Sequence, residues 1–221
     1  MAFKSLVDRL RSKPEWQHSD PGIRAEAVLR LPAGESDLLA QIAREDVEPR
    51  VRRAAVKKLS DPALLGELSQ ADTEEGVRAE AVTRLAALVV HGHEEGPALV
   101  ALALVTDARH LGEVARSSAL ESVRNAAIAR LHDARTLAAV VRECTDPATR
   151  LVALARIDDA PTLLGIAQKT ELRAVALAAV DRLTDPKALE AVAAKARLAP
   201  AARRARARLA DLAVSGAGAP A

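Results

Sequence analysis

One nine-residue pattern returns along most of the chain and constrains the fold more than any other feature. The pattern is V-R-x-x-A-V-x-R-L, often followed by an Asp two residues after the Leu. Its copies, some of them degenerate, start at positions 23, 51, 77, 97, 123, 149, 175 and 201. The last five starts are evenly spaced, and their separation is the period of the repeat, whereas the copies at 77 and 97 lie closer together. A period of this length predicts an array of stacked structural repeats.

Each repeat is predicted to contain two short helices. Within the pattern, apolar residues fall at offsets 0, 4, 5 and 8, which lie on one face of an α-helix. A new helix is expected to begin at the dipeptides Asp61-Pro62, Asp146-Pro147 and Asp185-Pro186, because Asp caps free N–H groups and Pro suits the first helical position. The short spacing before position 97 predicts that one second helix is missing there. So small a helix pair must stack on its neighbours to bury both apolar faces.

The composition excludes several classes of protein. The 221 residues include one Phe, one Trp and no Tyr, so the core must be aliphatic. One cysteine, Cys144, permits neither a disulfide framework nor a cysteine-rich zinc site. Two aromatic side chains cannot make a platform on which single-stranded nucleic acid stacks its bases. The near-balance of 32 basic and 30 acidic residues, with abundant aliphatics, argues against disorder.

The repeats are predicted to form one long domain with different ends. Residues 1–19 are expected to be a capping helix followed by Trp16, which covers the end of the core. Residues 20–211 are expected to be the repeat domain, and residues 212–221 a flexible tail. We find neither a signal peptide nor an apolar segment long enough to cross a bilayer, so a cytoplasmic protein that does not enter membranes is expected.

The Val-Arg pairs with their trailing Ala, Leu and Asp, as at Val51-Arg52, Val77-Arg78 and Val123-Arg124, resemble HEAT-like repeats. The likeness is greatest to the short, phycobilisome-lyase-type variety of bacterial proteins, and it extends from about residue 20 to residue 209. It implies an all-α fold, a right-handed α-solenoid of about seven to eight helix pairs, that binds other macromolecules. A minority of such proteins are bilin lyases or DNA glycosylases. The repeats here lack the aromatic residues of a glycosylase and show no tetrapyrrole pocket, so no enzymatic activity is predicted.

Two basic columns run through the repeats. The first arginine column, at offset 1, lies within the apolar arc of the helix, where a charge must be paired. Carboxylates just before each helix (Asp20, Glu48, Glu74, Glu121, Asp146) or at the start of the next helix (Asp61, Asp133, Asp159) are the expected partners. This column is predicted to be a structural ladder between repeats, and it consists of Arg24, Arg52, Arg78, Arg124 and Arg150.

The second basic column, at offset 7, lies at the edge of the apolar face. It consists of Arg30, Lys58, Arg84, Arg130, Arg156, Arg182 and Arg208. These side chains are either a solvated rim or a cationic ridge that binds an acidic partner or a phosphate backbone. From Lys195 to Arg208 there are also six basic residues and no acid, which is either a solvent face or a docking site. The second column, Arg203 and Arg204 are the candidate partner-binding residues.

The sequence offers little for chemistry. His91 and His93 stand beside two glutamates but lack a second ligand set, and no metal site or cofactor is predicted. Cys144 stands beside acidic residues, Glu143 and Asp146, a setting that disfavours a nucleophilic thiolate. The sequence therefore predicts a non-catalytic helical-repeat scaffold that binds another protein, either acidic or helical, and no small-molecule substrate. The alternative is nucleic-acid binding along the second column and the basic C-terminus.

Overall fold

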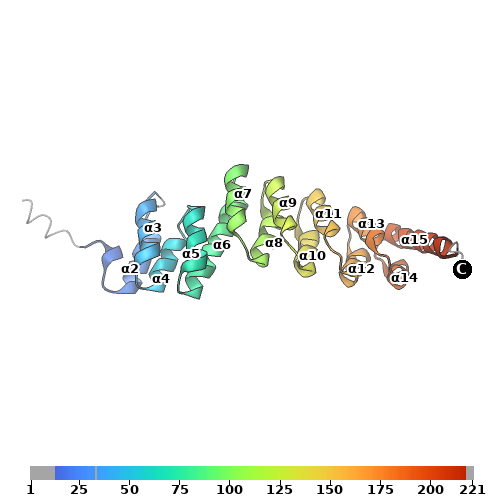
Figure 1. Ribbon diagram of the computed structural model, residues 1–221, viewed down its shortest axis with the longest axis horizontal. Helices are drawn as coiled ribbons and strands as arrows, with labels where there is room; N and C mark the ends of the chain where they lie inside the picture. Colours follow the sequence, from blue (N-terminus) through green and yellow to red (C-terminus); the bar gives the residue numbers. More distant parts are fainter. Residues whose placement is uncertain (1–12, 33, 218–221) are drawn as a thin grey trace, which may run out of the picture. The chain divides into compact units, whose positions relative to one another are not determined.

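The computed structural model describes residues 13–32 and 34–217. The capping helix predicted within residues 1–12 lies outside this part. In the described part all the regular structure is helical (Figure 1). A 3₁₀ turn, η1 (Glu15–Gln17), precedes α2 (Pro21–Arg30), α3 (Ser36–Glu45), α4 (Pro49–Val56), α5 (Pro62–Ala71), α6 (Glu75–His91), α7 (Glu95–Leu104) and α8 (Ala108–Ser117). Then come α9 (Glu121–Ala129), α10 (Ala134–Glu143), α11 (Pro147–Ala155), α12 (Ala160–Lys169), α13 (Arg173–Arg182), α14 (Pro186–Lys195) and α15 (Ala199–Ala217).

The chain divides into two compact units. The first unit contains residues up to Val89 together with Val100–Val105, and the second contains Val90–Leu99 and the residues from Thr106 onward. Near the division, α6 runs for 17 residues without interruption and α7 follows directly, so no separate second helix lies between them. This matches the helix predicted to be missing there.

The helices begin where the sequence indicates. The side chain of Asp61 accepts a hydrogen bond from the backbone N–H of Ala63, and those of Asp146 and Asp185 cap α11 and α14 in the same way. Each is followed by Pro, whose missing N–H loses no hydrogen bond in the first turn. Helix α15 continues to Ala217, so residues 212–217, predicted to be part of a flexible tail, are helical.

In the second unit, alternate helices form two layers. Helices α9, α11, α13 and α15 contact one another in succession, and so do α8, α10, α12 and α14 (Figure 1). Each helix of the second series also packs against the helix that follows it in the chain. The core between the layers comes from the predicted offsets, for example Val123, Ala127, Ile128 and Leu131, which are at most 1% exposed. The constant period thus places equivalent side chains at equivalent positions of successive helices.

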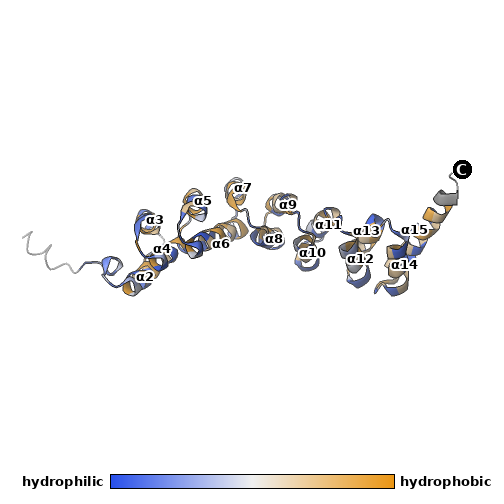
Figure 2. Ribbon diagram, turned by 60° about the horizontal axis from the view of Figure 1, so that its bottom comes forward, coloured by the Kyte–Doolittle hydropathy of each residue, from blue (hydrophilic) through white to orange (hydrophobic). Residues whose placement is uncertain are grey.

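The first unit is built from the same parts. Helix α2 packs against η1 and α4, and α3 packs against α4. Trp16 in η1 is half-buried. Among the described helices, none is long and apolar enough to cross a membrane. Helices of both units carry hydrophobic and hydrophilic residues side by side (Figure 2).

Candidate functional site

The first arginine column caps the ends of helices. Each of these arginines donates to the carbonyl of the residue six positions earlier, which is the C-cap residue immediately after the preceding helical element. The N–O distances are 3.0 Å for Arg24 to His18, 2.9 Å for Arg52 to Asp46, 2.7 Å for Arg78 to Asp72 and 3.0 Å for Arg124 to Ser118. Arg150 donates to the carbonyl of Cys144 from its Nε, whereas the other four arginines donate from Nη1. These carbonyls have no partner within their own helix, so the arginines satisfy them.

Three arginines of this column also reach the next repeat. Arg24 binds both carboxylate oxygens of Asp46 at 2.9 Å, and Arg52 binds those of Asp72 at 2.9 and 2.8 Å. Arg124 donates to the hydroxyl of Thr149 at 2.9 Å and lies 3.4 Å from Asp146. In these three places an arginine pairs with a side chain of the next repeat, as the predicted structural ladder requires. Asp46 and Asp72 were not among the carboxylates that the sequence analysis predicted as partners.

The Arg52–Asp72 pair shows the electrostatics of the ladder most clearly. Its side chains are only 10% and 5% exposed. The hydrogen bonds from Arg52 lower the pKa of Asp72, with a further contribution from the backbone N–H of Glu74, and they outweigh the opposing effect of burial. The same hydrogen bonds raise the pKa of Arg52. The pair therefore stays charged on folding and joins two repeats inside the first unit.

The partners that the sequence analysis missed follow a local rule. The residues six positions before the column arginines are His18, Asp46, Asp72, Ser118 and Cys144, and Thr170 occupies the same position one period later. Most of these side chains accept a hydrogen bond from the backbone N–H two residues on, as Asp46 does from Glu48 and Ser118 from Leu120. A recurrent turn-forming residue at this position is a sequence signal for the loop that receives the arginine.

The second basic column largely contacts the backbone of the preceding repeat. Arg84 donates to the carbonyl of Leu59 at 2.7 Å, Arg156 to that of Leu131 at 3.4 Å, and Arg182 to that of Ile157 at 3.0 Å. Arg208 reaches Leu183 at 3.2 Å and Lys58 reaches Leu29 at 2.9 Å. Since the accepting carbonyls lie near helix C-termini, this column is a second set of caps between repeats.

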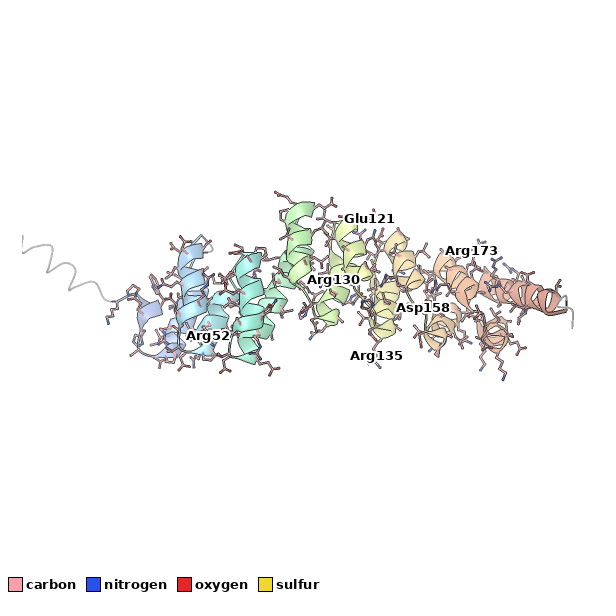
Figure 3. The ribbon with its side chains drawn as sticks, viewed as in Figure 1. Arg52, Glu121, Arg130, Arg135, Asp158 and Arg173 are labelled. Carbon is pink, nitrogen blue, oxygen red and sulfur yellow. The ribbon has the colours of Figure 1, made fainter. Side chains whose placement is uncertain are left out.

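The remaining members of the candidate set differ in their surroundings. Arg30 is exposed and pairs with Glu15, and Arg182 also pairs with Asp158 at 2.7 Å. Arg130, labelled with Asp158 in Figure 3, is half-buried at the end of α9. On α15, Arg204 pairs with Asp181 at 2.6 Å while Arg203 is exposed. The basic C-terminal segment is therefore partly neutralised by the acid of α13.

A cavity lies in the second unit, between α10 and α12. It measures about 620 Å³, and its aliphatic floor includes Ala138, Val141 and Ile166. Around the floor stand four basic side chains, Arg135, Arg142, Arg150 and Lys169, and one acidic side chain, Glu171. Figure 3 labels Arg135, on α10. The volume is in the range of sites that bind ligands or the side chains of a partner, and the sequence analysis did not identify this cavity.

The histidines and the cysteine considered in the sequence analysis do not form a reactive or metal-binding cluster in the described part of the chain. His91 and His93 are exposed, and within residues 13–32 and 34–217 no three His, Cys, Asp or Glu side chains are grouped as a metal site would need. Cys144 is 1% exposed and contributes its backbone carbonyl to the contact with Arg150. Comparison of the chain with protein-family models and with curated proteins gave no match.

Proposed function

We propose that this protein is a non-catalytic helical-repeat scaffold that binds another protein. The observation that carries the proposal is the use of the two basic columns. At nearly every step their side chains join one repeat to the next, through carboxylates such as Asp72 or through backbone carbonyls such as that of Leu59. These contacts between repeats hold short helices in register. Stacked repeats present an extended surface suited to binding macromolecules.

The same proposal includes the shape of the array. The two layers of helices, the constant period and the Val-Arg motifs support a HEAT-like, right-handed α-solenoid of about seven to eight helix pairs. In a solenoid of this kind each repeat contacts only its neighbours. Small-angle X-ray scattering of the full chain tests this part: an elongated particle is expected, and a spherical one would contradict it.

A protein partner is favoured over nucleic acid by the engagement of the cations. The predicted cationic ridge is tied to backbone carbonyls, and on α15 Arg204 and Arg208 contact Asp181. Fixed side chains of this kind cannot rearrange freely along a phosphate backbone. The aliphatic floor of the α10–α12 cavity instead offers apolar surface, which nucleic-acid backbones do not use.

The experiment is in-cell photo-crosslinking with the full chain, using a photoreactive amino acid at Arg135 beside the cavity. A matched chain carries the amino acid at Arg109, the equivalent position of α8 one period earlier. Crosslinked proteins are identified by mass spectrometry after nuclease treatment, then purified and titrated by calorimetry. A protein that binds saturably as a purified component supports the proposal. Crosslinks mainly to nucleic acid, with salt-sensitive binding to DNA or RNA, would overturn it.

A further inference from the structure

We call the junction between two successive repeats a step, and we call it closed where side chains of the two repeats contact each other. The cavity between α10 and α12 lies at a step that lacks the contacts found at the step before it. The pairs α8–α10 and α10–α12 occupy equivalent places in the second unit, one period apart. Three contacts can be compared position by position, since moving each residue of the first step forward by one period gives its counterpart in the second.

The first contact is steric. A Cβ atom at Gly112 of α8 would lie 2.7 Å from the methyl carbon of Thr136 on α10, so α8 and α10 pack closely only because residue 112 is glycine. One period later the same positions hold Ala138 and Thr162, and both line the cavity. The added methyl group at Ala138 prevents the same close approach of α10 and α12.

The second contact is electrostatic. Arg116 of α8 pairs with Glu143 of α10 at 3.3 Å. One period later the positions hold Arg142 and Lys169, which are both basic and both line the cavity. An attractive pair is thus replaced by two like charges. The step after it is joined again, because Gln168 of α12 donates to the carbonyl of Ala191 in α14 at 3.0 Å.

The third contact belongs to the first arginine column. Arg124 is held by Asp146 and Thr149 of the next repeat, whereas the counterparts for Arg150 are Leu172 and Val175. Among the described residues, 13–32 and 34–217, no carboxylate lies within ion-pair distance of Arg150, although the closed steps at Arg24 and Arg52 have one. Arg150 therefore keeps its helix-capping contact and directs an unneutralised charge to the cavity.

The result is a built site for an anionic group beside an apolar one. Among the described residues no carboxylate lies within ion-pair distance of Arg150 or Lys169, and the one acid that lines the cavity, Glu171, pairs with Arg197 at 2.6 Å. Arg142 is only weakly compensated, since it lies 3.9 Å from Glu143, a carboxylate that also pairs with Arg116. The floor of Ala138, Val141 and Ile166 is at most 8% exposed, while Leu172 at the rim is 39% exposed. Gly165 adds space, since nothing lies within 4 Å of where its Cβ would be.

We propose that the α10–α12 cavity binds an acidic segment of a partner protein, whose carboxylates contact Arg150, Arg142 and Lys169 while an aliphatic side chain fills the floor. The inference rests on the proposed function and names the partner's chemistry. A protein segment fits better than nucleic acid because the cations converge on one aliphatic cavity and no aromatic side chain lines it. Guanidinium groups bind carboxylates through paired, charge-assisted hydrogen bonds.

The test uses the full chain and a fluorescent, N-acetylated peptide of Glu residues with Leu at every third or fourth position. Its control is the same peptide with Gln in place of every Glu. The acidic peptide is expected to bind saturably. Arg150→Gln is expected to weaken binding about tenfold, the loss of one charge-assisted contact, and Lys169→Glu is expected to weaken it more, because it also repels the peptide. Arg203→Gln removes an exposed charge from α15 and should leave binding unchanged.

Leu172→Asp separates binding from folding. The substitution restores the carboxylate that closes the Arg124 step and supplies a capping side chain at the start of α13, which now begins without one. It is expected to abolish peptide binding without lowering thermal stability. Peptide binding that is unaffected by Arg150→Gln, Lys169→Glu and Leu172→Asp would overturn the inference, and so would equal binding of the Gln peptide.

Two further arms distinguish this inference from the proposed function. Duplex DNA and single-stranded RNA are titrated under the same conditions, and binding tighter than that of the acidic peptide and lost in Lys169→Glu would overturn the choice of a protein segment. A crosslinked partner that binds Lys169→Glu and Leu172→Asp as well as the unchanged chain would overturn the cavity as its site. The scaffold function would then still stand.

Discussion

Arg52 in the first unit and Arg150 in the second occupy the same position of the repeat but have different neighbours. Arg52 lies against Asp72 with both side chains almost fully buried, whereas Arg150 lines a cavity together with Thr170 and Leu172 of the next repeat. Both donate to the carbonyl six residues earlier. In both places the arginine caps its own loop, and the residues of the following repeat decide whether its charge is neutralised.

The largest change in the free energy of unfolding is expected from removing the arginine of a closed step, Arg52. Arg52→Ala leaves the Asp72 carboxylate buried and unpaired, which typically costs about 3–5 kcal/mol. Arg150→Ala removes a capping contact but strands no carboxylate, so a loss of about 1 kcal/mol is expected. Urea unfolding of the two variants beside the unchanged chain measures the difference. Equal losses would break the distinction between the two steps.

The closed step should also depend on pH. The pKa of Asp72 is lowered on folding from an unfolded value of about 3.9. Its contribution to stability is therefore fully present above that pH and is lost as the pH falls through the lower, folded value. The stability gap between the unchanged chain and Asp72→Asn, from urea unfolding, should be constant from neutral pH down to about 5 and should then narrow. A gap that stays constant into strong acid would contradict the pairing.

Closing the open step should stabilise the second unit. Leu172→Asp supplies an N-cap and a partner for Arg150, and a gain of about 1–2 kcal/mol is expected. Val175→Thr, which restores only the hydroxyl that Arg124 meets at Thr149, should change stability less. Thermal unfolding monitored by circular dichroism measures both. A lower midpoint for Leu172→Asp would show that Arg150 is not positioned to pair across this step.

A smaller effect is expected from the glycines on either side of α10. Gly112→Ala places a methyl group against Thr136, and the clash of about 1–3 kcal/mol exceeds the gain in helix propensity of about 1 kcal/mol. Gly165→Ala meets open space and should stabilise α12 by up to about 1 kcal/mol. Calorimetric unfolding of both variants measures these opposite signs. The same sign for both would contradict the difference in packing between the two steps.

Much of the fold could be predicted because the repeat dictates it. The spacing of apolar residues located the buried positions, and the Asp-Pro pairs marked helix starts. The first arginine column was identified because a charge at offset 1 falls inside an apolar face. Its partners Asp46 and Asp72 were missed, since they lie in loops whose geometry is not evident from helix periodicity. The contacts of the second basic column were also missed, because backbone carbonyls carry no sequence signature.

The cavity could not be predicted for a different reason. Its origin lies in differences between copies, such as Glu143 against Lys169 and Asp146 against Leu172, and a search for what the copies share ignores these differences. The structure was needed to show that Lys169 and Leu172 line one cavity between α10 and α12. In a repeat protein, the departures from the repeat are as informative about binding as the repeat is about folding.

The central claim is that the same arginine is structural at a closed step and available at the open one. NMR of the arginine Nε–H groups during titration with the acidic peptide tests it most directly. The account predicts a saturable shift of the Arg150 signal, with the Arg52 and Arg124 signals unchanged. Shifts at exposed Arg203 with none at Arg150, or a shift of Arg52 as large as that of Arg150, would contradict it.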